Sequence, residues 1–193
     1  MVLAAGASSR MGAENKLLLP WGDKPVLAAV VDALAGAALH EVVVVVGHEA
    51  ETVAAVLEPY PVRVVANDDF AAGMAASLRT GIEAADAAAA GYLVALGDMP
   101  GITAGLVDLL CRRFAGGGRS AILLPAHGGR RGHPVIFAGG YREELLALSG
   151  DRGARSVVDR HPESVVEVPV SAPGIFADVD TPEEYRNLRE RSH

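Results

Sequence analysis

Short runs of aliphatic and β-branched residues alternate along this chain with longer Ala- and Leu-rich amphipathic segments. We expect strands at residues 1–4, 42–46, 62–66, 92–96 and 121–124. Helices are expected between them at residues 25–35, 50–57, 74–87 and 104–114. A strand followed by a crossover helix is the repeating unit of a parallel sheet. The alternation therefore predicts a three-layer α/β fold with a mostly parallel central sheet.

The rhythm of the sequence changes after about residue 125, where glycines gather around "RRGHPVIF" at residues 130–137. We expect a glycine-rich turn that leads into an extended segment, then helices at residues 141–148 and 154–160. A last helix is expected after Asp180, with Thr181 as its N-cap, Pro182 at the first helical position and Glu184 at the capping-box position. Because no linker separates this part, residues 1–193 are expected to form a single domain.

Composition limits the classes of partner. The net charge of −7 argues against a general nucleic-acid binder, which grips phosphates with clustered Lys and Arg, although a small phosphorylated ligand needs only a few local cations. No segment has the length and apolarity of a membrane span, and the start of the chain lacks a signal-peptide pattern. The single cysteine, Cys111, is expected to be a half-buried helix residue, which suits a cytoplasmic location.

The loop "LAAGASSRMG", residues 3–12, follows the first predicted strand directly. The loop is not a Walker A loop, because Met11 stands where the second glycine of that motif is needed. It is not a dinucleotide fingerprint either, because Gly6 is followed by Ala7 and Ser8, and the second glycine of G-x-G-x-x-G is missing. Its small side chains still allow backbone N–H groups to face an anion, with Arg10 and Lys16 close enough in sequence to neutralise phosphates. An ordinary tight βα turn is the alternative interpretation.

Carboxylates occur at two further points. In "LGDMP", Asp98 follows a predicted strand, at the end of the sheet where α/β proteins bind ligands, and a magnesium ion takes one or two carboxylates together with substrate phosphates. Asp98 could equally accept backbone N–H groups in a turn. In "FADVDTPEEY", Asp178 and Asp180 share a facing on an extended strand, so spacing does not decide which of them is a second ligand, and Asp180 could instead cap the last helix.

Seven motifs in order resemble those of the MobA-like nucleotidyltransferases, most closely the molybdenum cofactor cytidylyltransferases. They are "LAAGASSRMG", "NKLLL", "GMAASLRTGI", "LGDMP", "RGHPVIF", "GDRGAR" and "DVDTPEEY". The resemblance covers residues 2–185 and implies a Rossmann-like nucleotidyltransferase fold whose acceptor-binding elements lie mainly after residue 125.

The resemblance also implies roles for individual residues. It places the nucleotide against a set of small or polar residues: Leu3, Ala4, Ala5, Gly6, Asn67, Gly73 and Ser77. It makes Arg10 and Lys16 the cations on the triphosphate and Asp98 the magnesium ligand, with Asp180 as its partner at the metal. Arg10, Lys16 and Asp98 would carry catalysis, while His133 and residues 150–155 would lie nearer the acceptor.

The activity that the resemblance implies is the transfer of CMP from CTP to the phosphate of molybdopterin. Pyrophosphate is released, and the product is the cytosine dinucleotide form of the molybdenum cofactor. The expected cofactor is Mg²⁺, and the expected further partner is a molybdoenzyme or its maturation chaperone. Ala5 favours CTP, because guanylyl enzymes of this family usually carry glycine at that position.

Two alternatives remain open at this stage. A related transferase could use GTP or another small phosphorylated acceptor. A protein of a different class, a non-catalytic module that binds and delivers molybdopterin, is disfavoured by the joint presence of Arg10, Lys16 and Asp98. Only Met1 and Val2 precede Leu3, so we also expect a first strand of about four residues, short for a central strand.

Overall fold

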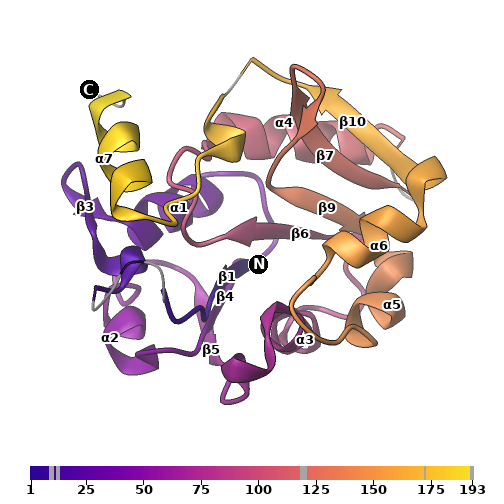
Figure 1. Cartoon of the computed structure of the whole chain (residues 1–193). Coiled ribbons are helices and arrows are strands. Elements are labelled where there is room, and N and C mark those ends of the chain that lie inside the picture. Colours follow the sequence, from indigo (N-terminus) through magenta and orange to yellow (C-terminus); the bar gives the residue numbers. More distant parts are fainter. Residues whose placement is uncertain (9–10, 12–13, 118–120, 172, 192–193) are drawn as a thin grey trace.

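The computed structural model describes residues 1–8, 11, 14–117, 121–171 and 173–191 (Figure 1). Within them, eight strands form one sheet in the order β10-β7-β9-β6-β1-β4-β5, with β8 paired to β7. The strands are β1 (Val2–Ala4), β4 (Val43–Val46), β5 (Arg63–Ala66), β6 (Gly91–Leu96), β7 (Ile122–His127), β8 (Arg130–Arg131), β9 (Val135–Ala138) and β10 (Val165–Pro169). The strand β1 has only three residues, yet it lies between β4 and β6 in the middle of the sheet.

The sheet is mostly parallel, as the sequence predicts. β1 pairs in parallel with β4 and β6, β4 with β5, and β7 with β10. The exception is β9, which runs antiparallel to both β6 and β7. The reversal begins at the β7–β8 hairpin, where Gly128 and Gly129 both have positive φ, the geometry of the two-residue turns that match strand twist.

Helices cover both faces of the sheet. One face packs against α1 (Val26–Ala35), α2 (Ala50–Ala55) and α4 (Ala104–Ala115). The other packs against α3 (Met74–Ala84), α5 (Arg142–Leu146) and α6 (Arg155–Arg160). Alternate strand residues enter the two cores, as Val44 and Val43 do on β4, because side chains alternate across a strand. The three-layer α/β fold is therefore confirmed (Figure 1).

Several predicted boundaries move by a few residues. The helix expected at residues 74–87 ends at Ala84, and the one expected at 141–148 ends at Leu146. Pro25 is not inside the first helix but caps it from the short β2–β3 hairpin, Pro20–Trp21 and Lys24–Pro25. The extended segment expected in "RRGHPVIF" is β9, whereas β10 has no counterpart among the predicted strands.

The last helix, α7 (Pro182–Arg191), begins as predicted. The Thr181 hydroxyl accepts the Glu184 backbone N–H at 3.2 Å and donates to the Glu184 carboxylate at 2.8 Å. These bonds satisfy one of the N–H groups that a helix start leaves without a partner. Among the described residues, no helix has both the length and the apolarity needed to cross a membrane.

Candidate active site

A cleft of about 420 Å³ opens where β1 and β6 end at their carboxyl termini. Its walls come from the loops after these strands, the start of α3 and the segment before α7. Most of the residues implied by the resemblance line it: Leu3, Ala4, Ala5, Gly6, Lys16, Gly73, Ser77, Asp98 and Asp180. Ligands of open α/β sheets bind at this end of the strands, so the cleft has the position of a substrate site.

Lys16 is held at this cleft by a short local structure. It begins a 3-10 helix (Lys16–Leu18), which Asn15 caps by accepting the Leu17 backbone N–H at 3.1 Å. Leu17 is buried in the core, and the Lys16 backbone N–H donates to the Ser8 hydroxyl at 3.3 Å. These contacts fix the base of the Lys16 side chain, so that its ammonium group reaches the strand ends.

The Lys16 ammonium lies between two carboxylates. Its Nζ is 2.5 Å from Asp98 Oδ2 and 2.6 Å from Asp180 Oδ1, although both partners are 82 residues or more away in sequence. The Val179 backbone N–H donates to the Asp98 carbonyl at 2.9 Å and ties the segment before α7 to the end of β6. The side chains of Lys16 and Asp98 are only 13% and 16% exposed, so the pair is partly shielded from solvent.

The cleft carries more negative than positive charge. Its described lining includes four carboxylates, Asp98, Asp151, Asp178 and Asp180, and Lys16 as the one cation. Burial disfavours the charge on Lys16, but Asp98 and Asp180 outweigh this effect and raise the pKa of Lys16. The pKa of Asp178 is raised, first by burial and then by repulsion from Asp180 and Asp98. An anionic ligand would therefore need positive charge beyond that of the described lining.

One oxygen of Asp98 has no partner in the described part of the chain. Asp98 Oδ1 is buried and accepts no hydrogen bond from the described residues, while Oδ2 pairs with Lys16. A buried carboxylate oxygen without a donor is costly unless another group satisfies it. Within the described chain, no three His, Cys, Asp or Glu side chains converge as a complete metal site. A site with only one or two carboxylate ligands suits magnesium, which takes its other ligands from substrate phosphates and water.

Asn67 stands behind the cleft wall. Its side chain donates to the Ser77 hydroxyl at 3.0 Å and accepts the Asp69 backbone N–H at 3.0 Å, and both Asn67 and Ser77 are buried. Ser77 lines the cleft, whereas Asn67 does not. In the structure, Asn67 therefore positions the Ser77 side chain, which forms part of the cleft wall.

Two other predicted site residues are not part of the described cleft lining, for different reasons. Arg10 falls outside the described residues. His133 lines a neighbouring cavity of about 480 Å³, together with Arg130, Arg131 and Arg155, over an apolar floor that includes Val94 and Phe137. Burial lowers the pKa of His133, and the charge of Asp98, which lines the cleft, opposes this effect.

The cleft also contains residues that the sequence did not assign to the nucleotide. Phe70, Met74, Asp151 and Asp178 line it. Asp151 belongs to "GDRGAR", which the resemblance placed nearer the acceptor, but the Gly150 carbonyl accepts the Ala75 backbone N–H at 3.1 Å and brings this segment to the start of α3. The signal for Asp178 was its shared facing with Asp180.

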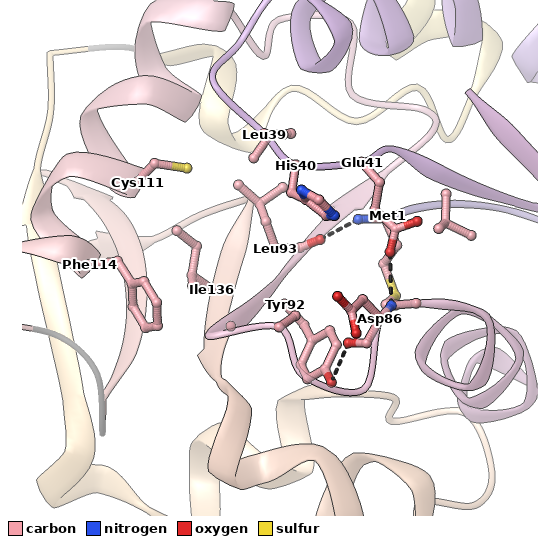
Figure 2. A pocket seen from close by; sticks show the side chains of 14 residues that line it. Met1, Leu39, His40, Glu41, Asp86, Tyr92, Leu93, Cys111, Phe114 and Ile136 are labelled. Carbon is pink, nitrogen blue, oxygen red and sulfur yellow. Dashed lines mark hydrogen bonds between the residues drawn. The ribbon is translucent and has the colours of Figure 1, made fainter. Parts of the chain in front are cut away.

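A third cavity, of about 150 Å³, lies at the opposite end of the strands (Figure 2). There the Met1 amino group donates to the Leu93 carbonyl at 2.6 Å, and the Glu41 carboxylate accepts the Asp86 backbone N–H at 2.9 Å. Cys111 lines this cavity, and burial followed by the Asp108 charge raises the pKa of its thiol. A raised pKa reduces the thiolate fraction, and Cys111 is a partly buried residue of α4, as the sequence predicts.

Comparisons with known proteins identify the same kind of fold. Residues 1–165 match the model of the family described as MobA-like NTP transferase domain. A nicotine blue oxidoreductase from Paenarthrobacter nicotinovorans is 33% identical over 97% of this chain and 94% of its own.

Two solved structures are similar over nearly the whole chain. Rv0371c from Mycobacterium tuberculosis, in complex with manganese, is 30% identical, with a TM-score of 0.82 over 98% of this chain and 96% of that one. A nucleotidyl transferase from Methanothermobacter is 30% identical, with a TM-score of 0.83 over 98% of this chain and 94% of that one.

Proposed function

Because this chain belongs to the MobA-like NTP transferase family, we propose that it transfers CMP from CTP to the phosphate of molybdopterin and releases pyrophosphate. The observation that carries the proposal is the convergence of Lys16, Asp98 and Asp180 at the strand ends, in a cleft floored by residues 3–6. A small-residue floor, a cation and paired carboxylates are the parts that nucleotidyl transfer needs.

In the proposed reaction, an oxygen of the acceptor phosphate forms a bond to the α-phosphorus of CTP as the bond to the β-phosphate oxygen breaks. Pyrophosphate leaves with the electron pair of that bond. The attacking phosphate is ionised at neutral pH, so no side chain has to remove a proton. Lys16, and Arg10 by the resemblance, stabilise the negative charge that grows on the leaving group.

Mg²⁺ is the proposed cofactor, and Asp98 and Asp180 are its proposed ligands. When bound, the ion would supply positive charge to the phosphate oxygens. Among the described residues, Asp98 Oδ1 has no partner and carboxylates outnumber cations in the cleft, which fits a divalent cation. The related Rv0371c structure with manganese supports a divalent cation in this fold.

The cavity beside His133 is the proposed acceptor site. Arg130 and Arg155 line it, and no ion pair within the described chain neutralises either guanidinium. Arg130 also stacks on Phe176, with its Cζ 4.5 Å from the ring centre. Free cations above an apolar floor suit a planar acceptor that carries a phosphate. A molybdoenzyme or its chaperone is the proposed recipient of the product.

The preference for CTP is assigned to the residue at position 5. Ala5 is 4% exposed, and a Cβ built on Gly47 would lie 2.8 Å from its methyl group, so this part of the floor is tightly packed. Ala5 lines the cleft, and a methyl group at this position would leave less room beside the base than glycine would, which favours a pyrimidine over a purine.

The first test measures pyrophosphate release by the purified protein with molybdopterin and Mg²⁺, using CTP, GTP and ATP in turn. We expect CTP to be turned over fastest. Asp98→Asn should lower kcat by about 100-fold or more, because a charged group that acts on the transition state is lost.

The matched control for this test is Asp32→Asn, since Asp32 pairs with Lys24 on the surface of α1 as Asp98 pairs with Lys16 in the cleft. Asp32→Asn should retain activity. Preferential use of GTP would contradict the cytidylyl assignment, and undiminished release in Asp98→Asn would contradict the metal-assisted mechanism. No release with any acceptor would favour a binding or delivery module.

A second candidate function comes from the relative named nicotine blue oxidoreductase, which matches nearly the whole chain. Its test is reduction of nicotine blue with a reduced nicotinamide or flavin as electron donor. Turnover there, without pyrophosphate release from any nucleotide, would replace the transferase proposal. This candidate is disfavoured because residues 3–12 do not match the glycine fingerprint that binds nicotinamide and flavin dinucleotides.

A further inference from the structure

Lys16 stands at the point where a cation shared by Asp98 and Asp180 would lie. Its Nζ contacts an oxygen of each carboxylate, at 2.5 and 2.6 Å, and the three side chains are mostly buried. Two carboxylates this close would repel each other strongly without a positive charge between them. Lys16 supplies that charge in the protein without ligand.

We propose that Lys16 closes this site to free divalent cations, and that a cation enters together with a nucleoside triphosphate whose phosphates draw Lys16 away from the two carboxylates. The inference rests on the proposed function for the identity of the anion. It goes beyond that function by assigning Lys16 two positions, one on the carboxylates and one on the phosphates, and by making metal binding depend on nucleotide.

Charge balance supports the exchange. A second cation placed beside the Lys16 ammonium would be repelled by it, and this repulsion is strong because the cluster is shielded from water. A triphosphate offers Lys16 new anionic oxygens, so its positive charge stays paired when it leaves Asp98 and Asp180. Metal and nucleotide then promote each other's binding by the same factor, as linkage requires.

The geometry also allows one competing arrangement. Asp98 Oδ1 is free of hydrogen bonds from the described residues, so a cation could bind that oxygen while Lys16 remains on Oδ2. In that arrangement Lys16 does not move, and metal binds without nucleotide. The two arrangements differ in what happens to the Lys16 side chain when metal arrives.

The composition makes this difference measurable, because the chain has two lysines, Lys16 and Lys24. Protein labelled with ¹³C at lysine Cε gives one resonance for each, and Lys24→Met assigns them. Lys24 pairs with Asp32 at the surface, away from the cleft lining, and serves as the internal control. The resonances are followed with Mg²⁺ alone, with the α,β-methylene analogue of CTP alone, and with both.

The expected result is that millimolar Mg²⁺ alone leaves the Lys16 resonance in place, whereas Mg²⁺ with the analogue shifts it and leaves Lys24 unchanged. Calorimetry with Mn²⁺ alone provides a second readout. Lys16→Met should bind Mn²⁺ about tenfold or more tightly than the native chain, because a repelling unit charge is removed, while Lys24→Met should not. Mn²⁺ and the analogue should promote each other's binding in the native chain and much less in Lys16→Met.

Saturation of the native chain by Mg²⁺ with an unmoved Lys16 resonance would overturn the proposal, as would equal Mn²⁺ affinity in the native and Lys16→Met chains. If Lys16→Met does not fold, the resonances of the native chain still decide. The metal-only measurements need no nucleotide, so they test separately whether Lys16 closes the site, whereas absence of nucleotide binding would contradict both the proposed function and the displacement of Lys16 by phosphates.

Discussion

At the scale of single residues, His133 shows how the fold sets a protonation state. Burial lowers the pKa of His133, and the Asp98 charge and a hydrogen bond with the Val94 backbone only partly oppose this effect. The ring Nδ1 is buried and has no partner within the described chain. The lowered pKa therefore favours the neutral form of His133 at pH 7, with Nδ1 buried in the wall of the proposed acceptor cavity.

This burial predicts a pH dependence of stability. Between pH 7 and 5 the unfolded chain protonates His133 near its ordinary pKa of about 6.5, while the folded chain does not, so the free energy of unfolding falls as pH falls. Above pH 7 both states are neutral and His133 contributes no slope. Urea unfolding at several pH values should show a smaller fall in stability for His133→Gln than for the native chain.

The control for the His133 prediction is His40→Gln, because His40 is exposed. It should leave the slope of stability against pH unchanged. NMR titration of the histidine Cε1 protons provides a direct check, in which the signal that disappears in His133→Gln must have a midpoint below 6.5. A midpoint at or above that value would show that burial does not control this ring.

The site residues were predictable from the sequence to different degrees. Asp98 stood out because it directly follows a predicted strand, but its convergence with Lys16 and Asp180 depends on the sheet order, since strand pairing brings residue 16 to residue 98. The choice between Asp178 and Asp180 could not be made from spacing. It depends on the bond from Val179 to Asp98, which orients the whole segment.

At the scale of elements, the start of α3 is the most constrained point of the cleft wall. Gly73 caps α3 with φ of 100° and ψ of 178°, a region that is nearly exclusive to glycine. A Cβ at this position would lie 3.0 Å from the Gly150 carbonyl carbon and would clash with the Asp151 carboxylate. The close approach of α3 to the segment at residues 150–153 therefore requires glycine here.

Gly73→Ala should cost about 2 to 4 kcal/mol of unfolding free energy, from the strained backbone together with the displaced segment. Its matched control is Gly22→Ala, with a φ of 64° but open space around the Cβ, which should cost about 1 kcal/mol. Both are measured by urea unfolding, and Gly73→Ala should also bind nucleotide more weakly. Equal costs for the two variants would show that the contact with residues 150–153 contributes nothing.

The elements of the first half were predictable because strand and helix periods alternate clearly there. In the second half, the direction of β9 was not predictable, since it is decided by pairing with β6 and β7 on either side. β10 was missed because it is an edge strand with exposed Val166 and Glu167, so it lacks the apolar run of a central parallel strand.

At the scale of the whole molecule, one core passes through both halves of the sequence. The core under α1 and α4 contains Val2 and Val44 from the first half of the sequence and Leu123 and Val168 from the second half. Pairing of β6 with β9 continues the sheet between these sides. The two parts are therefore expected to unfold together, as one domain.

The single tryptophan, Trp21, offers a test of this cooperativity. Trp21 lies in the β2–β3 hairpin and packs, with Tyr185 and Leu188, against Met11, Val26 and Val179. Its fluorescence and the far-UV circular dichroism of the whole chain should change at the same urea concentration. Trp21→Phe identifies the fluorescence background. A fluorescence transition well before the loss of helix would show that the chain is divided into separately unfolding parts.

The order in which the site residues occur along the chain has a consequence for synthesis on the ribosome. The floor of the cleft comes from residues 3–6, but β1 cannot take its place until β6 has been made, and Asp180 reaches Lys16 only when the segment before α7 exists. A growing polypeptide thus carries Asp98 and Lys16 without their third partner until residue 180 has been made. A chain that stops before Asp180 therefore lacks one of the three charged groups that meet in the cleft.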